Sequence, residues 1–127
     1  ELFKSLIVGE TVLLLGSTKI LLDIATDAYD LCPKYNDPKI QDRDWRTLDK
    51  YYDTIIGCGP FNFTEELTEE LFQLFQKNCD RLILRTFYKP QWEPKYSKYF
   101  PNPEDFVIVP KVYNDNGHHR FFVWDFV

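Results

Sequence analysis

Short apolar runs that alternate with helical patterns dominate this chain of 127 residues. Continuous apolar runs of four to eight residues are typical of strands that are covered on both faces. The strands that we predict from these runs lie at 12–15, 52–57 and 81–87. A further short strand within 28–33 must end before Pro33, and the polar segment 34–44 is expected to be loop with one short turn or strand.

Helical spacing of apolar residues marks the segments between these strands. We predict a lead-in helix over 2–8 that ends at Gly9, and a second helix over 19–25. Thr64 is predicted to cap the clearest helix, since acidic residues crowd the following turns and Lys77 lies near the helix end. The buried stripe that we predict for this helix consists of Leu67, Leu71, Leu74 and Phe75.

The end of the chain predicts a hairpin. Two strands are expected at 106–113 and 119–124, and the Asn-Gly pair within 114–117 is a strong signal for the turn that joins them. The segment 89–103, rich in proline and aromatic residues, is expected to be a structured insertion. Alternating strands and helices predict one α/β domain over 1–127, with a three-layer Rossmann-like architecture and a mostly parallel sheet. The hairpin would add an antiparallel edge.

Composition narrows the function classes. The net charge of −5 disfavours nucleic acid as a partner, because such sites need clustered Lys and Arg. No apolar run approaches the roughly 18 residues that cross a bilayer, so no membrane partner is expected. The cysteines Cys32, Cys58 and Cys79 show no CxxC spacing, which favours a reduced, cytoplasmic compartment and argues against a metal site.

Glycine-containing turns follow two of the predicted strands. Gly16, in the turn 15–18, lets the backbone leave the strand sharply, and the helix behind it offers free N–H groups to an anionic group. The turn 57–62 has the sequence Gly-Cys-Gly-Pro-Phe-Asn. Ligands of open α/β sheets lie at the carboxyl ends of strands, so both turns predict a nucleotide-type site. Ordinary strand-to-helix turns are the alternative.

Acidic and aromatic residues after the next strands also fit a nucleotide. Asp30 ends the second predicted strand, where a carboxylate can bind ribose hydroxyls, and a loop aspartate is the alternative. Asp44 and Trp45 fit an adenine, which would meet a carboxylate and an aromatic wall. Their alternative is a core tryptophan beside a solvated aspartate. The chain has no full GxGxxG, so a nicotinamide-dependent oxidoreductase is only a third candidate.

The ordered set of these segments resembles class I S-adenosylmethionine-dependent methyltransferases over about residues 11–88. The segments that carry the resemblance are Leu13–Thr18, Tyr29–Pro33, Asp44–Leu48, Tyr52–Asn62 and Leu82–Phe87. The closing hairpin is compatible with the last two strands of that family. The resemblance implies that S-adenosylmethionine is the cofactor.

The resemblance also implies where individual residues would lie. Gly16 would lie under the methionine part of the cofactor, Asp30 would bind the ribose, and the pair 44–45 would flank the adenine. The loop 57–62 would line the methyl-transfer site. The cofactor-binding residues predicted in this way are Gly16, Ser17, Asp30, Asp44, Trp45, Gly57, Cys58 and Gly59. The predicted substrate-binding residues are Pro60, Phe61, Asn62 and Tyr88.

Methyl transfer asks little of protein side chains, because the sulfonium of the cofactor is already an activated methyl donor. A base is needed only where the acceptor loses a proton, and the candidates are Asp53, Tyr88 and Asp105. Cys58 has no sequence-adjacent partner that would make it a nucleophile. The cations Arg85 and Lys89 are expected to be solvated rather than to steer an anionic substrate. The histidines His118 and His119 are expected to be exposed hairpin residues.

The sequence therefore predicts a methyltransferase that acts on a small molecule or a protein side chain. The alternative is a non-catalytic domain of the same fold, used for binding or assembly. Two departures favour it: the first turn has one glycine where the family commonly has two or three, and the segment between Asp30 and Asp44 is short for a full helix. A homodimer is a further expectation, with the terminal strand rich in Phe and Trp as its edge.

Overall fold

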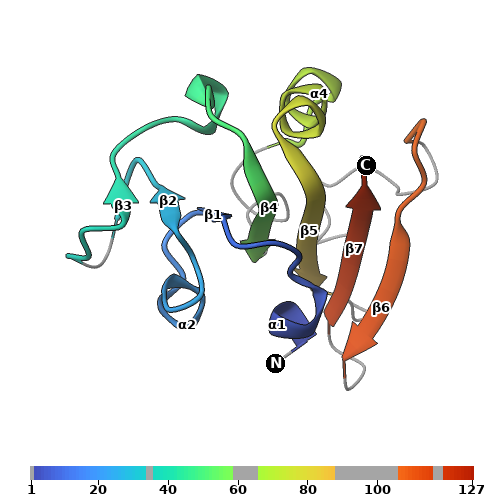
Figure 1. Cartoon of the computed structure of the whole chain (residues 1–127), viewed down its shortest axis with the longest axis horizontal. Helices are drawn as coiled ribbons and strands as arrows, with labels where there is room; N and C mark the ends of the chain where they lie inside the picture. Colours follow the sequence, from blue (N-terminus) through green and yellow to red (C-terminus); the bar gives the residue numbers. More distant parts are fainter. Residues whose placement is uncertain (1, 34–35, 59–65, 88–105, 116–118) are drawn as a thin grey trace.

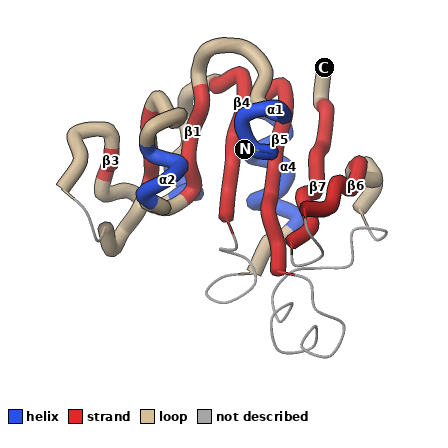
Figure 2. Tube along the Cα trace, turned by 90° about the horizontal axis from the view of Figure 1, so that it is seen from below, coloured by secondary structure: helices blue, strands red, loops and turns tan. Residues whose placement is uncertain are grey.

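Seven strands form one central sheet in the computed structural model, which describes residues 2–33, 36–58, 66–87, 106–115 and 119–127 (Figure 1). The strands are β1 (Val12–Leu15), β2 (Asp27–Tyr29), β3 (Ile40–Gln41), β4 (Tyr52–Cys58), β5 (Cys79–Phe87), β6 (Lys111–Asp115) and β7 (His119–Asp125). Their order in the sheet is β3-β2-β1-β4-β5-β7-β6 (Figure 1 and Figure 2). The described helices are α1 (Leu2–Leu6), α2 (Lys19–Leu22), the 3-10 helix η1 (Trp45–Thr47) and α4 (Glu69–Lys77).

The sheet is parallel from β3 to β5, and β7 runs antiparallel to both of its neighbours. The predicted α/β fold with a mostly parallel sheet and a C-terminal hairpin is thereby confirmed. Within this hairpin, β7 lies between β5 and β6, so β6 and not the terminal strand is at the edge of the sheet. All four residues from Phe121 to Trp124 are buried, which is why this strand sits inside the sheet. It is therefore not an edge for a homodimer, and the homodimer itself stays a prediction.

Two hydrophobic clusters cover the two faces of the sheet and make the fold three-layered. One contains Leu13 and Leu15 of β1 together with the apolar side of α4. The other contains Val12 and Leu14 together with the apolar residues of α1 and α2. Successive side chains of a strand point to opposite faces, so a strand buried on both sides needs an apolar residue at every position. This explains the continuous apolar runs of the sequence.

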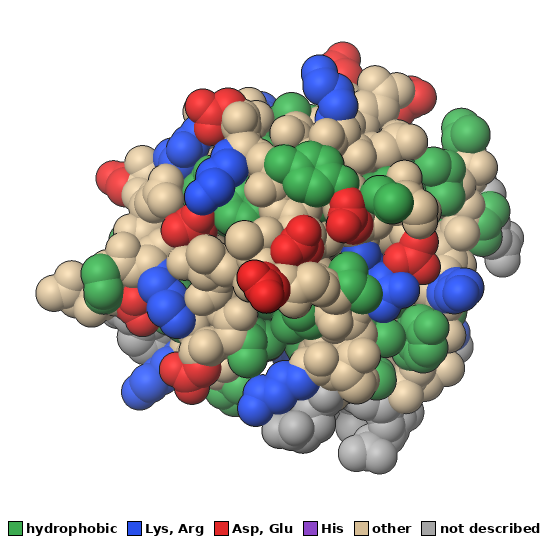
Figure 3. Space-filling model, viewed as in Figure 1, with side chains coloured by type: hydrophobic (Ala, Val, Ile, Leu, Met, Phe, Trp, Pro, Cys, Tyr) green, Lys and Arg blue, Asp and Glu red, His purple; other side chains and the backbone are tan. Residues whose placement is uncertain are grey.

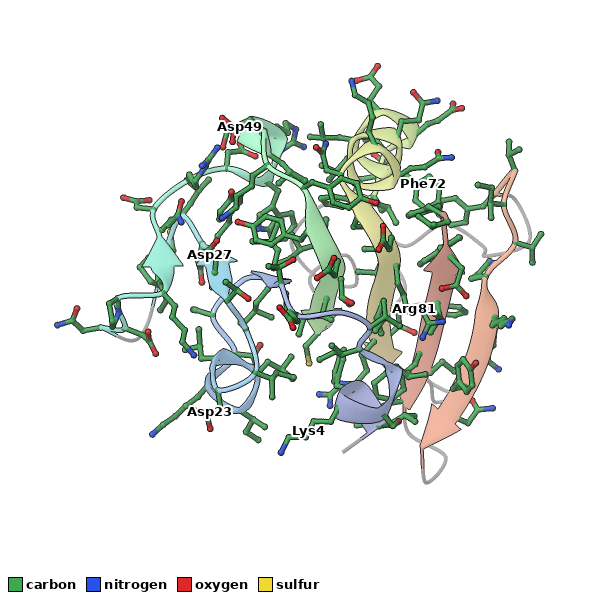
Figure 4. All side chains as sticks on the ribbon, viewed as in Figure 1. Lys4, Asp23, Asp27, Asp49, Phe72 and Arg81 are labelled. Carbon is green, nitrogen blue, oxygen red and sulfur yellow. The ribbon has the colours of Figure 1, made fainter. Side chains whose placement is uncertain are left out.

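Helix α4 begins four residues later than the sequence suggested. Thr68 is its N-cap, and the Thr68 hydroxyl oxygen accepts a hydrogen bond from the backbone N–H of Leu71 at 3.2 Å. The cap predicted at Thr64 lies outside the described residues, but 66–68 are described and are not helical. With this start, Phe72 is buried on the sheet (Figure 4), whereas Leu74 is only partly buried.

Other element boundaries are also shorter than predicted. Helix α1 ends at Leu6, α2 ends at Leu22, and β6 starts only at Lys111. No full helix joins β2 to β3 in the described residues 30–33 and 36–39, as the short spacing indicated. Among the described helices, none has the length and the apolar character needed to cross a bilayer.

We expect Thr68→Ala to lower the free energy of unfolding by about 1 kcal/mol, the usual effect of removing a helix cap. Thr68→Ser is the matched control, because it keeps the hydroxyl that accepts the Leu71 N–H and should be close to wild type. Urea unfolding followed by circular dichroism measures both. Equal stability of the alanine and serine variants would show that Thr68 does not cap α4.

Candidate functional site

The carboxyl ends of β1 and β2 meet at the main-chain oxygen of Tyr29. This oxygen accepts one hydrogen bond from the backbone N–H of Gly16 and another from the indole Nε1–H of Trp45, each at 2.9 Å. Gly16 follows directly on the Leu15–Tyr29 pair, the last pair of the β1–β2 ladder. Two of the predicted cofactor-binding residues, from separate parts of the sequence, are therefore neighbours in the structure.

Gly16 has a positive φ of 104°, which side chains other than glycine rarely adopt. In the part of the chain that the structure describes, a Cβ atom placed on Gly16 would meet no heavy atom within 4 Å. The glycine is therefore required by the backbone turn and not by packing, and the space beside the turn is open.

Ser17 and Asp30 are brought together across the ends of the same two strands. The Ser17 hydroxyl donates to Asp30 Oδ2 at 2.5 Å, and the backbone N–H of Cys32 donates to Asp30 Oδ1 at 2.9 Å. Each carboxylate oxygen can accept a second hydrogen bond, so a fixed and half-buried Asp30 still has capacity for a ligand. The structure places Gly16, Ser17, Asp30 and Trp45 around one strand junction.

Asp44 has a structural partner of its own at the start of η1. Its Oδ1 accepts from the backbone N–H of Arg46 at 2.9 Å and lies 3.3 Å from the Arg46 guanidinium. The neighbouring Arg43 has its guanidinium carbon 4.5 Å from the centre of the Tyr29 ring. Asp44 thus acts as the cap of η1, and its contact with an adenine stays a prediction.

Gly57 lies inside the sheet and not in the loop that was predicted to line the site. It is paired with Leu15 on one side and with Leu84 on the other. Cys58, paired with Arg85, is the last residue of β4.

The other predicted site residues lie outside the described residues: Gly59, Pro60, Phe61, Asn62 and Tyr88. The same holds for Asp105 and His118, whereas His119 begins β7 and is partly buried.

A pocket of about 290 Å³ opens beside Cys58, between α1 and α2 on one face of the sheet. We call it the α1–α2 pocket. Its lining residues are Phe3, Lys4, Thr18, Ile20, Leu21, Asp23, Ile24, Cys58 and Arg85. Thr18 stands at the N-cap position of α2, two residues after Gly16, and lines the pocket, so the pocket adjoins the strand junction. No sequence pattern indicates that the lead-in helix contributes to a site, because only tertiary packing brings Phe3 and Lys4 there.

The Cys58 thiol in this pocket is not set up as a nucleophile. Burial raises the pKa of Cys58, and the nearby Arg85 guanidinium offsets only part of this effect. A thiol with a raised pKa is protonated at neutral pH, whereas the thiolate is the nucleophilic form. Cys58 therefore acts as a lining residue.

Comparison with known proteins bears on the fold. The sequence matches no protein-family model and no curated protein. Among solved structures, the magnesium protoporphyrin IX methyltransferase ChlM from Synechocystis PCC 6803 with bound SAM is similar over 96% of this chain and 72% of its own, with a TM-score of 0.51 and 16% identity. The N-methyltransferase NodS from Bradyrhizobium japonicum WM9 is similar over 91% of this chain and 85% of its own, with a TM-score of 0.58 and 9% identity.

The methyltransferase domain of bacterial CtHen1 is similar over 98% of this chain and 93% of its own, with a TM-score of 0.55 and 12% identity. This chain has the class I methyltransferase fold. The resemblance seen in the sequence is thereby confirmed at the level of the fold. Identities of this size carry no information on the substrate.

Within the methyltransferase fold, Asp53 lies at the wrong end of β4 to serve as a base. It is the second residue of the strand, at the amino end, whereas ligands bind at the carboxyl ends. Its Oδ2 accepts from the backbone N–H of Glu10 at 2.7 Å and of Thr11 at 3.0 Å. A Cβ on Gly9 would come within 2.4 Å of Asp53, so this carboxylate holds the chain entering β1.

The same hydrogen bonds, chiefly that from Thr11, lower the pKa of Asp53 below its ordinary value of 3.8. Its ionisation therefore stabilises the fold above that pH, and the contribution is lost as the pH falls through the lowered folded-state pKa.

We expect wild type to be more stable than Asp53→Asn at about pH 6, with the difference shrinking progressively below pH 3.8. Urea unfolding across this range checks it, and a pH-independent difference would contradict the assignment.

Proposed function

We propose that the protein is an S-adenosylmethionine-dependent methyltransferase that acts on a small molecule or a protein side chain. The observation that carries the proposal is the gathering of Gly16, Ser17, Asp30 and Trp45 at the carboxyl ends of β1 and β2. In open α/β sheets, ligands bind at this end of the strands. The methyltransferase fold and the adjoining α1–α2 pocket support the same assignment.

The cofactor half of the proposed site is formed by the strand junction. The open space beside Gly16 would take the methionine part, because no atom of the described residues lies within 4 Å of the position of a Cβ there. Asp30 would accept hydrogen bonds from the ribose hydroxyls with the lone pairs that Ser17 and Cys32 leave unused. The indole N–H of Trp45 is already bonded to Tyr29, so Trp45 would meet an adenine through its ring.

The acceptor half of the proposed site is the α1–α2 pocket at the ends of β4 and β5. S-adenosylmethionine supplies an activated methyl group, so the protein mainly has to align the acceptor with it. Thr18 lines the pocket and follows Gly16 by two residues, so cofactor and acceptor would lie side by side. Cys58 of β4 and Arg85 of β5 are the residues of the sheet that line this pocket.

We further propose a cytoplasmic location. Cys32, Cys58 and Cys79 are free thiols, Cys32 exposed and Cys79 buried. Unpaired cysteines are typical of proteins that work in a reducing compartment.

Calorimetric titration of the folded protein with S-adenosylmethionine and S-adenosylhomocysteine tests the proposal. We expect binding of both in the micromolar range, with NADH as a negative control. The absence of binding by a sample that is folded by circular dichroism would favour the non-catalytic alternative. Binding of NADH alone would favour an oxidoreductase.

Asp30→Ala is expected to weaken S-adenosylhomocysteine binding by about 1–3 kcal/mol, since the ribose hydroxyls would lose their acceptor. Glu70→Ala is the matched control, because it removes an exposed carboxylate from the first turn of α4, on the other face of the sheet. The control should bind like wild type. Unchanged affinity of Asp30→Ala would remove Asp30 from the site.

A further inference from the structure

The α1–α2 pocket combines an apolar interior with two cationic side chains. Its apolar lining consists of Phe3, Ile20, Leu21 and Ile24. Lys4 of α1 and Arg85 of β5 add positive charge, and Asp23 of α2 adds the only carboxylate among the described lining residues. Figure 4 shows Lys4 and Asp23 extending from their two helices on the same side of the sheet. We propose that this pocket binds a small methyl acceptor with an apolar body and an anionic group, such as a carboxylate or a phosphate.

This inference rests on the proposed function and names the class of its acceptor. The volume of about 290 Å³ lies at the lower end of the range of small-molecule sites, which is roughly 300–1,000 Å³. A ligand of one ring fills such a space, whereas an extended peptide would need a longer groove. The size therefore favours a small molecule over a protein side chain.

Arg85 is the side chain best placed to bind the anionic group. Its guanidinium carbon lies 5.8 Å from the centre of the Phe3 ring. The guanidinium is also close enough to the Cys58 thiol to lower the pKa of that thiol. In the part of the chain that the structure describes, no ion pair joins Arg85 or Lys4 to a carboxylate. A half-buried guanidinium of this kind offers a planar pair of donors that matches a carboxylate or a phosphate.

The charge balance of the pocket is opposite to that of the whole chain. The chain has 15 Lys and Arg against 20 Asp and Glu, whereas the described residues of the pocket lining include two cations and one carboxylate. On the face shown in Figure 3, basic side chains lie scattered among acidic ones. An anionic ligand would therefore gain more at this pocket than at an average place on the surface, and more so at low salt.

Alkylation of Cys58 by iodoacetamide, run at about pH 9 so that part of this thiol is ionised, provides a test within one molecule. Cys58 lines the pocket, whereas the exposed Cys32 does not line it and serves as the internal reference. The probes are benzoate and phenyl phosphate, with neutral benzyl alcohol as the control, and mass spectrometry follows each cysteine. We expect both anions to slow the alkylation of Cys58 several-fold and saturably, with no effect on Cys32 and none from benzyl alcohol. The better of the two anions identifies carboxylate or phosphate as the preferred group.

Two variants separate the role of Arg85 from general effects of charge. Arg85→Gln should weaken the apparent affinity for the better anion about tenfold, the effect of one charge-assisted hydrogen bond. Lys77→Gln, at the end of α4 on the other face, removes a positive charge of the same size and should have no effect. If Arg85→Gln does not fold, Arg85→Lys should show a smaller loss, because it keeps the charge without the planar pair of donors.

The inference is overturned if benzyl alcohol protects Cys58 as well as benzoate does, or if Arg85→Gln keeps full affinity. NMR shifts of the Thr18 and Cys58 amides give a second readout that does not depend on thiol reactivity. The probes are added without S-adenosylmethionine, so the two proposals fail separately. Anion binding without cofactor binding would refute the methyltransferase, whereas cofactor binding without anion binding would refute only the acceptor class.

Discussion

The main-chain oxygen of Tyr29 accepts hydrogen bonds from both Gly16 and Trp45, and the candidate site depends on this junction. One bond extends the contact between β1 and β2 by a residue and starts the turn at Gly16. The other bond, from the Trp45 indole, holds η1 at the carboxyl end of β2. Asp30, the next residue after Tyr29, thereby comes within hydrogen-bond distance of Ser17.

The burial of the sheet on both faces determines where the helices lie that surround the site. Apolar residues at successive positions of β1 and β4 require cover above and below, which α1 and α2 supply on one face and α4 on the other. The α1–α2 pocket lies between these two helices, beside the carboxyl ends of β4 and β5. The strand junction would hold the cofactor, and this pocket would hold the acceptor.

Local patterns in the sequence were enough to predict β1, β4 and β5, because a continuous apolar run is a property of neighbouring residues. They could not choose between Thr64 and Thr68 as the helix cap, since Thr-Glu-Glu-Leu occurs twice in succession. Features that depend on distant residues were missed. Asp53 binds backbone groups more than 40 residues away, and the insertion of β7 inside the sheet depends on pairing with β5. The placement of Lys4 and Arg85 around one pocket also depends on distant residues.

A nitrogen-15 NMR titration with S-adenosylhomocysteine tests the central claim most directly, because it shows where on the molecule the ligand binds. The account predicts that the largest shifts occur at the amides of Gly16, Ser17 and Asp30 and at the indole N–H of Trp45. Shifts concentrated on α4 and the residues 106–108, around the groove of about 380 Å³ on the other face, would contradict it. A spectrum without any shift would contradict it as well.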